Sequence, residues 1–465
     1  MDIAQVVNIL DELLFDQTGS HLDFIQKSVL ENTLQDKTYS EIALKTGYSE
    51  SHVADTASDL WKFLSELLGE KVRKANVKAI LEKTNFSSAI LGNTSSHITV
   101  TNNINLCPNN TYPNNNSPPT PLKSSTKLHL NNAPKFPYFY GRNNELSTLK
   151  DWLINQEIRL ITIFGISGIG KTATALHLIN EIPQHFDYII YRALYFSPSL
   201  TTTLTNLLQI FSPPEIPNDI ESKINLFIDY LTQYQCLIIL DDIQNLFTPQ
   251  KLAGTWQTDR TSYNLLFQAI AQSSHHSNII ILSQEKWLEI QQLEKANYPV
   301  KSLILSGLDS DATEILHHQN LANQELWPQL ITLYQSHPLW LELTAELIGE
   351  LYAGNVSEFL EYQRLIVPEG VRSCLDKQWQ KLATNEQTIM LQLAQETAPI
   401  GISKIILKID LVATEVVNSI SSLKMRFLLE TETTENGNLI SLSPILKEYI
   451  KSRYLLNLPD KGYNN

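Results

Sequence analysis

A glycine-rich segment in the middle of the chain has the residue types that bind phosphate. Glycines let the backbone curl so that successive N–H groups face a phosphate, and the N-terminal end of a following helix adds attraction. We expect Lys171 to bridge the β- and γ-phosphates and Thr172 to place its hydroxyl on Mg²⁺. A predicted buried strand, 159–164, precedes the loop, and a predicted helix, 173–178, follows it. The candidate nucleotide-binding residues here are Gly165, Ile166, Ser167, Gly168, Ile169, Gly170, Lys171, Thr172 and Ala173.

Two carboxylates follow a later apolar run, 236–240. We expect Asp241 to be the better Mg²⁺ partner, binding through water to the ion that Thr172 holds. Asp242 would polarise the attacking water, so Asp242 and Lys171 are the candidate catalytic residues. A pair of aspartates can also simply end a strand in a turn. The phosphate loop upstream favours the catalytic interpretation, because P-loop enzymes require such a carboxylate.

Short apolar runs alternate with helical segments after the phosphate loop. We expect strands at 188–194, 236–240 and 278–282 in addition to the strand before the loop. Runs that are apolar on both faces predict a parallel sheet covered by helices on each side. The sequence therefore predicts an α/β P-loop fold, with the ligand at the carboxyl ends of the strands.

Composition limits the class of protein. A chain of 465 residues with 43% hydrophobic content is long enough for two to four domains with real cores. Its three cysteines show no metal-ligand or redox spacing, which argues against zinc and disulfides. The start lacks a leader pattern and no apolar run is long enough to span a membrane, so we expect a cytoplasmic location and no membrane partner. The formal charge of -14 argues against indiscriminate nucleic-acid binding.

Residues 84–136 are rich in Asn, Ser, Thr and Pro. Such a segment buries too little apolar surface to offset the entropy of ordering, so we expect a disordered linker. It would tether a separate helical unit, 1–83, to the rest of the chain.

The middle of the N-terminal unit has a helix-turn-helix pattern. Ile42 and Ala43 would face a partner helix, Gly47 would supply the turn, Ser49 would cap the next helix, and Val53 would return to the core.

The second helix of this pattern is poorly suited to DNA. It offers Glu50, His52, Asp55 and Asp59, and no basic residue appears before Lys62. Carboxylates there would repel phosphates and cannot pair with guanine as arginine does. We therefore favour a protein-docking or oligomerising module over a DNA reader.

Taken in order, several short motifs resemble those of the NB-ARC family of signal-transduction ATPases with numerous domains. These motifs lie at 140–142, 165–172, 238–242, 304–308 and 335–339, and the resemblance extends from about 137 to 455. The stretches at 376–379, 423–430 and 440–446 look like the winged helix of that family. The N-terminal unit looks like the helix-turn-helix domain of vWA-MoxR-associated proteins.

This resemblance implies a site and a domain order. Tyr140 and Arg142 would border the adenine of ATP or ADP, and Pro338 would close over the base from a small all-helical domain. The expected order is a helix-turn-helix unit at 1–83, a linker at 84–136, a P-loop domain at 137–302, a small helical domain at 303–365, a winged helix at 366–455 and a tail at 456–465.

Three departures from the family bear on mechanism. Gln284 stands where the family usually has the arginine that reads the γ-phosphate, so we expect weaker sensing and transition-state stabilisation. Ser443 stands where many relatives have a histidine that contacts the β-phosphate of ADP. Arg142 and Arg192 could substitute for these groups, or could be structurally paired. Relatives usually carry repeats after the winged helix, and this sequence shows none, so we expect a partner or the N-terminal unit to supply the input.

We expect an ATP/ADP-dependent molecular switch with slow hydrolysis at most, in which nucleotide exchange opens a closed form for self-association. Two alternatives stay open: a nucleotide-controlled transcription regulator, and a binding-only scaffold without turnover. The expected partners are ATP or ADP with Mg²⁺, a protein that docks on the N-terminal unit, and further copies of the chain.

Overall fold

The structure is a computed structural model in which two units, 1–116 and 117–465, are each compact and are treated separately. It describes residues 7, 24–35, 37–46, 53, 56–58, 60–61, 64–65, 72–74, 76–78, 126–130, 133–195, 197–361, 365–435 and 437–455. Most of the predicted linker and the predicted tail at 456–465 lie outside these residues. In the described part of the chain, none of the helices combines the length and apolar character needed to cross a bilayer.

The N-terminal unit contains α2 (Phe24–Leu34) and α3 (Tyr39–Thr46). A reciprocal cap starts α3, because the Thr38 N–H donates to Glu41 and the Glu41 N–H donates to the Thr38 hydroxyl. Ile42, Ala43 and Val53 are buried together, as the helix-turn-helix pattern predicts. The expected turn and cap, Gly47 and Ser49, and the charged residues Glu50, His52, Asp55, Asp59 and Lys62 lie outside the described residues.

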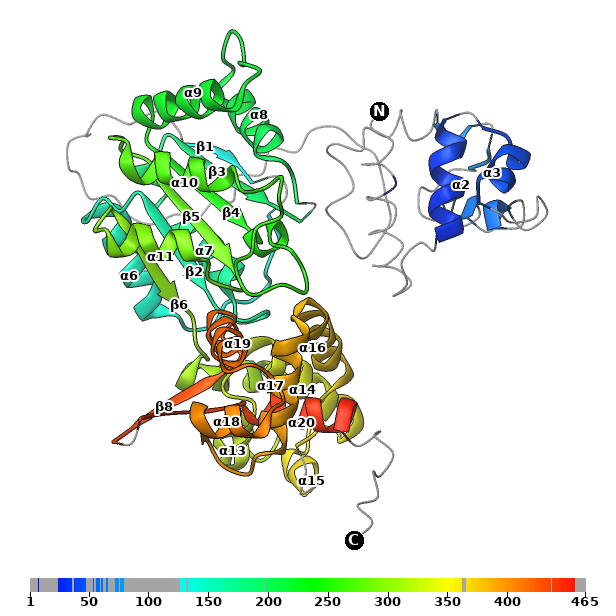
Figure 1. The fold of residues 1–465 in the computed structure, drawn as a ribbon, viewed down its shortest axis with the longest axis vertical. Coiled ribbons are helices and arrows are strands. Elements are labelled where there is room, and N and C mark those ends of the chain that lie inside the picture. Colours follow the sequence, from blue (N-terminus) through cyan, green and yellow to red (C-terminus); the bar gives the residue numbers. More distant parts are fainter. Residues whose placement is uncertain are drawn as a thin grey trace, which may run out of the picture. The chain divides into compact units, whose positions relative to one another are not determined.

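A six-stranded, all-parallel sheet forms the centre of the second unit, as the sequence predicts (Figure 1). The strand order is β1-β3-β4-β5-β2-β6, with β2 and its phosphate loop next to β5. The strands are β1 (Lys127–His129), β2 (Leu160–Phe164), β3 (Tyr188–Ala193), β4 (Cys236–Asp241), β5 (Asn278–Ser283) and β6 (Val300–Ile304).

Helices cover both faces of this sheet, because alternate strand residues point to opposite sides. On β4, Leu237 and Ile239 pack in one core with α6 (Asn143–Ile154) and α7 (Lys171–Glu181). Ile238 and Leu240 pack in the other core. That second core takes residues from α8 (Leu200–Phe211), α9 (Ile220–Gln233), α10 (Tyr263–Gln272) and α11 (Leu288–Lys295).

The predicted linker, 84–136, extends too far toward the C-terminus. Strand β1 lies inside this range and pairs in parallel with β3, as the edge strand of the sheet. This pairing uses backbone groups, so a polar sequence can provide it, and the Lys127 ammonium adds a 2.9 Å bond to the Tyr188 hydroxyl. A composition-based prediction misses a strand of three residues, because so short a segment has no apolar periodicity to detect.

The remainder of the unit is mostly helical. The small helical part contains α12 (Thr313–His318), α13 (Trp327–Leu333), α14 (Pro338–Leu351) and α15 (Val356–Leu360). A winged-helix part follows, with α16 (Glu369–Lys381), α17 (Thr384–Gln395), β7 (Ile400–Gly401), α18 (Ile402–Lys408), α19 (Ala413–Met425), β8 (Glu430–Thr434), β9 (Gly437–Ser441) and α20 (Pro444–Ile450). Its three strands form an antiparallel sheet in the order β7-β9-β8.

One arginine, Arg426 at the end of α19, joins the winged helix to the sheet domain. The guanidinium of Arg426 lies 2.7 Å from the Glu285 carboxylate and 3.1 Å from that of Glu386, and all three side chains are buried. It also donates to the backbone carbonyl of Lys251 at 2.8 Å. Two carboxylates from different domains therefore share one buried cation.

Further hydrogen bonds, most of them to backbone groups, lie at the same interface. The Ser422 hydroxyl donates to Glu386 and accepts from the Ala253 N–H, each at 2.6 Å. The Lys286 N–H donates to the carbonyl of Met425 at 2.9 Å. Since residues 285 and 286 directly follow Gln284 after the end of β5, the winged helix is docked on the segment where the resembled family has its γ-phosphate-reading arginine.

We predict that Arg426→Met lowers the free energy of unfolding by about 3–5 kcal/mol, because it leaves Glu285 and Glu386 buried without a cation. Urea unfolding followed by tryptophan fluorescence measures this loss. The control is Arg372→Met, since Arg372 pairs with Glu369 at the surface and such pairs contribute about 0–1 kcal/mol. Equal losses in the two variants would show that the buried cation has no special role.

The same cluster predicts a pH dependence. Burial, with Glu386 nearby, raises the pKa of Glu285 to about 7 despite the opposing effect of Arg426. The folded state then holds this proton more tightly than the unfolded state, so stability is lost as pH rises from about 4.5 to 7, by up to about 3 kcal/mol. In urea titrations at pH 5 and pH 8, Glu285→Gln should show a smaller difference between the two pH values than the wild type. An unchanged difference would assign the pH dependence to other groups.

Candidate functional site

A cavity of about 360 Å³ lies at the carboxyl end of the sheet, between the phosphate loop and the small helical part. Of the residues predicted to bind nucleotide or metal or to act in catalysis, eleven line it: Tyr140, Arg142, Ser167, Gly168, Ile169, Gly170, Lys171, Thr172, Ala173, Asp242 and Pro338. Gln284 also lines it. Gly165, Ile166 and Asp241 are not among the lining residues.

The loop is shaped by glycines in the left-handed region of backbone space. Gly170 has φ 100° and is the residue just before α7, so a side chain there would be strained. Gly168 has φ 79°, and a Cβ there would come within 2.5 Å of Leu339 in α14. The glycine at 168 therefore lets the small helical part touch the loop directly.

Lys171 is turned into the loop and is nearly buried. Its ammonium donates to the backbone carbonyls of Gly165 at 2.8 Å and Ile166 at 2.9 Å. Burial lowers its pKa to about 8, while Asp241 and Asp242 act in the opposite direction. The two carbonyls carry only partial charges, so an anionic phosphate in the cavity would be a stronger partner for this ammonium.

Asp241 is held by three donors at the end of β4. One carboxylate oxygen accepts from the Thr172 hydroxyl at 2.7 Å and from the Tyr191 hydroxyl at 2.8 Å, and the other accepts from the Asp242 N–H at 2.7 Å. Burial and the nearby Asp242 raise the pKa of Asp241 to about 6.

The oxygen atoms of Thr172 and Asp241 fit Mg²⁺, which prefers hard oxygen ligands and keeps several waters. The 2.7 Å hydrogen bond places the hydroxyl and the carboxylate side by side at the phosphate end of the cavity. Thr172 would hold the ion directly and Asp241 would act beside it. Bound there, Mg²⁺ would neutralise phosphate charge.

Asp242 is positioned by a residue that sequence analysis missed. Its backbone is left-handed, at φ 59°, and its carboxylate accepts from the side-chain amide of Gln244 at 2.6 Å. The same amide accepts from the Gln284 N–H at 3.2 Å. Gln244 thus connects the predicted water-polarising carboxylate to Gln284, which stands where the resembled family has its γ-phosphate-reading arginine.

His337 lies within the motif at 335–339 and is a second residue to which the sequence assigned no role. It caps α14, because its Nδ1 accepts from the Trp340 N–H at 3.3 Å, and its Nε2 donates to the Ser167 carbonyl in the loop at 3.1 Å. Burial lowers its pKa to about 3, so the ring is neutral. Its place just before Pro338, at the start of a helix, was the available signal.

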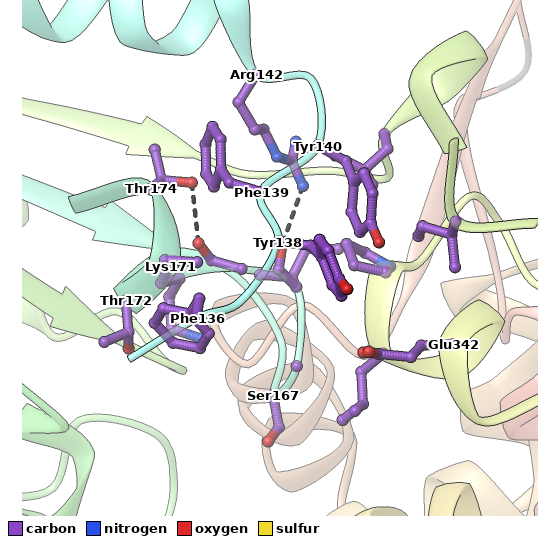
Figure 2. A pocket seen from close by; sticks show the side chains of 18 of the residues that line it. Phe136, Tyr138, Phe139, Tyr140, Arg142, Ser167, Lys171, Thr172, Thr174 and Glu342 are labelled. Atoms are coloured by element: carbon purple, nitrogen blue, oxygen red, sulfur yellow. Dashed lines mark hydrogen bonds between the residues drawn. The ribbon is translucent and has the colours of Figure 1, made fainter. Parts of the chain in front are cut away.

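The far wall of the cavity is aromatic (Figure 2). Tyr138 packs on His318 with ring centroids 3.8 Å apart, and Tyr140 lies next to both. Glu342 from α14 faces this wall, and burial raises its pKa. Phe136 also lines the cavity, although it was predicted to end the linker.

The two candidate substitute arginines are structurally paired. The guanidinium of Arg142 donates to the backbone carbonyls of Ile169 at 2.9 Å and Ser306 at 2.6 Å, and so joins the loop to the segment after β6. Arg192 donates to the carbonyl of Tyr191 at 2.7 Å. These arginines were expected either to substitute for the missing phosphate-contacting residues or to be structurally paired. Their contacts favour the structural interpretation.

The winged helix does not reach the cavity. Ser443 is buried and caps α20, where its hydroxyl accepts from the Leu446 N–H at 3.4 Å. No residue of the described winged-helix part lines the cavity. The winged helix docks instead on the segment after Gln284, through Arg426 with Glu285 and through the Lys286 N–H with Met425.

Two family models match this chain. Residues 1–84 match the N-terminal HTH of vWA-MoxR associated proteins, and residues 154–289 match an AAA domain. Among curated proteins, a WD repeat-containing protein of Nostoc sp. is 32% identical over 343 residues, covering 70% of this chain and 27% of that protein. A disease resistance protein of Arabidopsis thaliana is 21% identical over 252 residues, covering 51% of this chain and 17% of that protein. The chain thus spans about a quarter or less of the length of these relatives.

Solved structures with similar chains include a Signal Transduction ATPase with Numerous Domains that has a tetratricopeptide repeat sensor, from Pyrococcus horikoshii. It is 18% identical, with 69% of this chain and 43% of that chain covered and a TM-score of 0.33. A Walker-type ATPase of Pyrococcus abyssi is 12% identical, with 70% and 98% covered and a TM-score of 0.47. From the family models and the site geometry, the chain carries an N-terminal HTH domain of the vWA-MoxR associated protein type and an AAA-type P-loop ATPase domain.

Proposed function

We propose that this chain is an ATP/ADP-binding molecular switch of the NB-ARC type with slow or weak hydrolysis. One observation carries the proposal: the phosphate loop with Thr172 and Pro338 of the small helical part line one cavity, and the Asp241 carboxylate accepts a hydrogen bond from the Thr172 hydroxyl. Nucleotide bound there would contact both the loop and α14. A ligand that touches two parts can bias their arrangement by its difference in affinity for the two states.

In this proposal, the interface with the winged helix transmits the effect of the bound nucleotide to that domain. Gln284 lines the cavity, and the next residue, Glu285, holds Arg426 of the winged helix. A γ-phosphate that moved the end of β5 would strain this ion pair, whereas ADP would leave it in place. In this proposal the closed form is held by protein contacts, and ATP acts to loosen them.

Partners and setting are part of the proposal. We expect self-association of the open form, and docking of a partner protein on the N-terminal unit, in signalling or defence. The relative named as a disease resistance protein supports the defence setting. DNA reading stays a second candidate because residues 1–84 match an HTH model, although the predicted second helix has no basic footprint.

The central experiment is nucleotide binding by the purified chain. Lys171→Ala removes the charge beside the phosphates and should weaken ATP and ADP binding by about 10–100-fold, measured by calorimetry. Lys223→Ala is the matched control, because Lys223 is also a buried lysine but donates to Thr205 in α8, away from the cavity. If wild type binds neither nucleotide, or if both variants bind like wild type, the proposal fails.

Gln284 generates a separate prediction about the discrimination of ATP from ADP. Gln284→Arg brings a positive charge to the cavity near the expected γ-phosphate, so ATP affinity should rise about tenfold while ADP affinity changes little. The ratio of the two dissociation constants is the readout. Gln284→Met, which has similar size and no charge, should not raise the ratio. A rise with methionine, or none with arginine, would contradict a sensing role for position 284.

A further inference from the structure

Tyr191 reaches Asp241 because of the register between two central strands. Tyr191 in β3 pairs with Ile239 in β4, while Asp241 is paired with Ala193. Residues 239 and 241 lie on the same face of the sheet, since side chains alternate along a strand. Asp241 is therefore the diagonal neighbour of Tyr191, two residues beyond its direct partner on the neighbouring strand. The tyrosine side chain is long enough to reach it, and its hydroxyl donates to the Asp241 carboxylate at 2.8 Å.

The rest of the tyrosine side chain is fixed by packing. Tyr191 is fully buried, in the same apolar core as Ile239 and Ile189. Phenylalanine would fill this core equally well, so packing alone gives no reason for a hydroxyl. A buried hydroxyl needs a partner, and Asp241 provides it.

The hydroxyl contributes to the arrangement of the predicted metal site. The Asp241 oxygen that accepts from Tyr191 also accepts from the Thr172 hydroxyl, and the other oxygen accepts from the Asp242 N–H. Three donors from three directions fix the plane of the carboxylate. The Thr172 hydroxyl then has a fixed acceptor for its proton, so its lone pairs point in a defined direction, as a metal ligand requires.

We propose that Tyr191 is the positioning residue of the Mg²⁺ site: its hydroxyl orients Asp241, which in turn orients Thr172 toward the ion. This inference rests on the proposed nucleotide-binding function and goes beyond it. Tyr191 itself does not touch the metal or the nucleotide. Without its hydroxyl, only the Thr172 hydroxyl and the Asp242 N–H still hold the carboxylate, so the orientation of the carboxylate and of the acceptor for the Thr172 proton is less firmly fixed.

The test is the Mg²⁺ dependence of ADP binding in Tyr191→Phe, with the full chain. ADP affinity is measured by calorimetry over a range of MgCl₂ concentrations and in EDTA. We expect the Mg²⁺ concentration for half-maximal enhancement to rise about tenfold, the scale seen when partners of metal ligands are removed. The affinity in EDTA should change less than about twofold, because the phosphate loop keeps its own contacts.

Tyr188→Phe is the matched control. Tyr188 is a buried tyrosine on the same strand, and its hydroxyl accepts from Lys127 instead of donating to Asp241. This variant should keep the wild-type Mg²⁺ dependence. Thermal unfolding of both variants establishes that each one is folded.

A double-mutant cycle with Asp241→Asn gives a second measurement. If Tyr191 acts through Asp241, adding Tyr191→Phe to Asp241→Asn should cause no further change in Mg²⁺ dependence. The inference is overturned if Tyr191→Phe leaves Mg²⁺ dependence unchanged, or if it weakens ADP binding equally in Mg²⁺ and in EDTA. A wild type that binds ADP under neither condition overturns the proposed function, and this inference with it.

Discussion

The arrangement of the second unit depends on one buried guanidinium. Arg426 of the winged helix is shared by Glu285 of the sheet domain and Glu386 of α17, and a charge at this depth needs such partners. Since Glu285 directly follows Gln284, adjacent residues line the cavity and hold the winged helix. The docking of the winged helix is therefore set by protein groups, and a ligand in the cavity would act on it through the end of β5.

The cavity is built from short polar groups that longer side chains hold in place; Tyr191 and Gln244 lie outside the recognisable motifs, and His337 lies within the motif at 335–339. Asp241 is held by Tyr191, Asp242 by Gln244, and the loop carbonyl at Ser167 by His337. Each of these supporting side chains is buried, and each belongs to a different element. The chemistry of the site is thus concentrated in the motifs, while its geometry is distributed over the surrounding fold.

The sequence predicted the parts of this molecule that leave a local pattern. Apolar runs that alternate with helices predict a parallel sheet, and the glycines with Lys171 and Thr172 predict the loop, because both depend on neighbouring residues. Gln244 and Tyr191 could not be predicted in this way, since their roles arise from strand register and from residues far apart in the chain. The docking of the winged helix could not be predicted for a similar reason, since Arg426, Glu285 and Glu386 are far apart in the sequence and meet only in the fold.

The contact between Gly168 and Leu339 has a mechanical consequence. The side chain of Leu339 already occupies the space that a Cβ at position 168 would need, and His337 closes the same side. Close-packed groups cannot interpenetrate, so an outward movement of the loop at this point must push α14 by the same amount. The first turn of α14 must therefore shift when the loop moves outward, even where this turn makes no bond to the bound molecule.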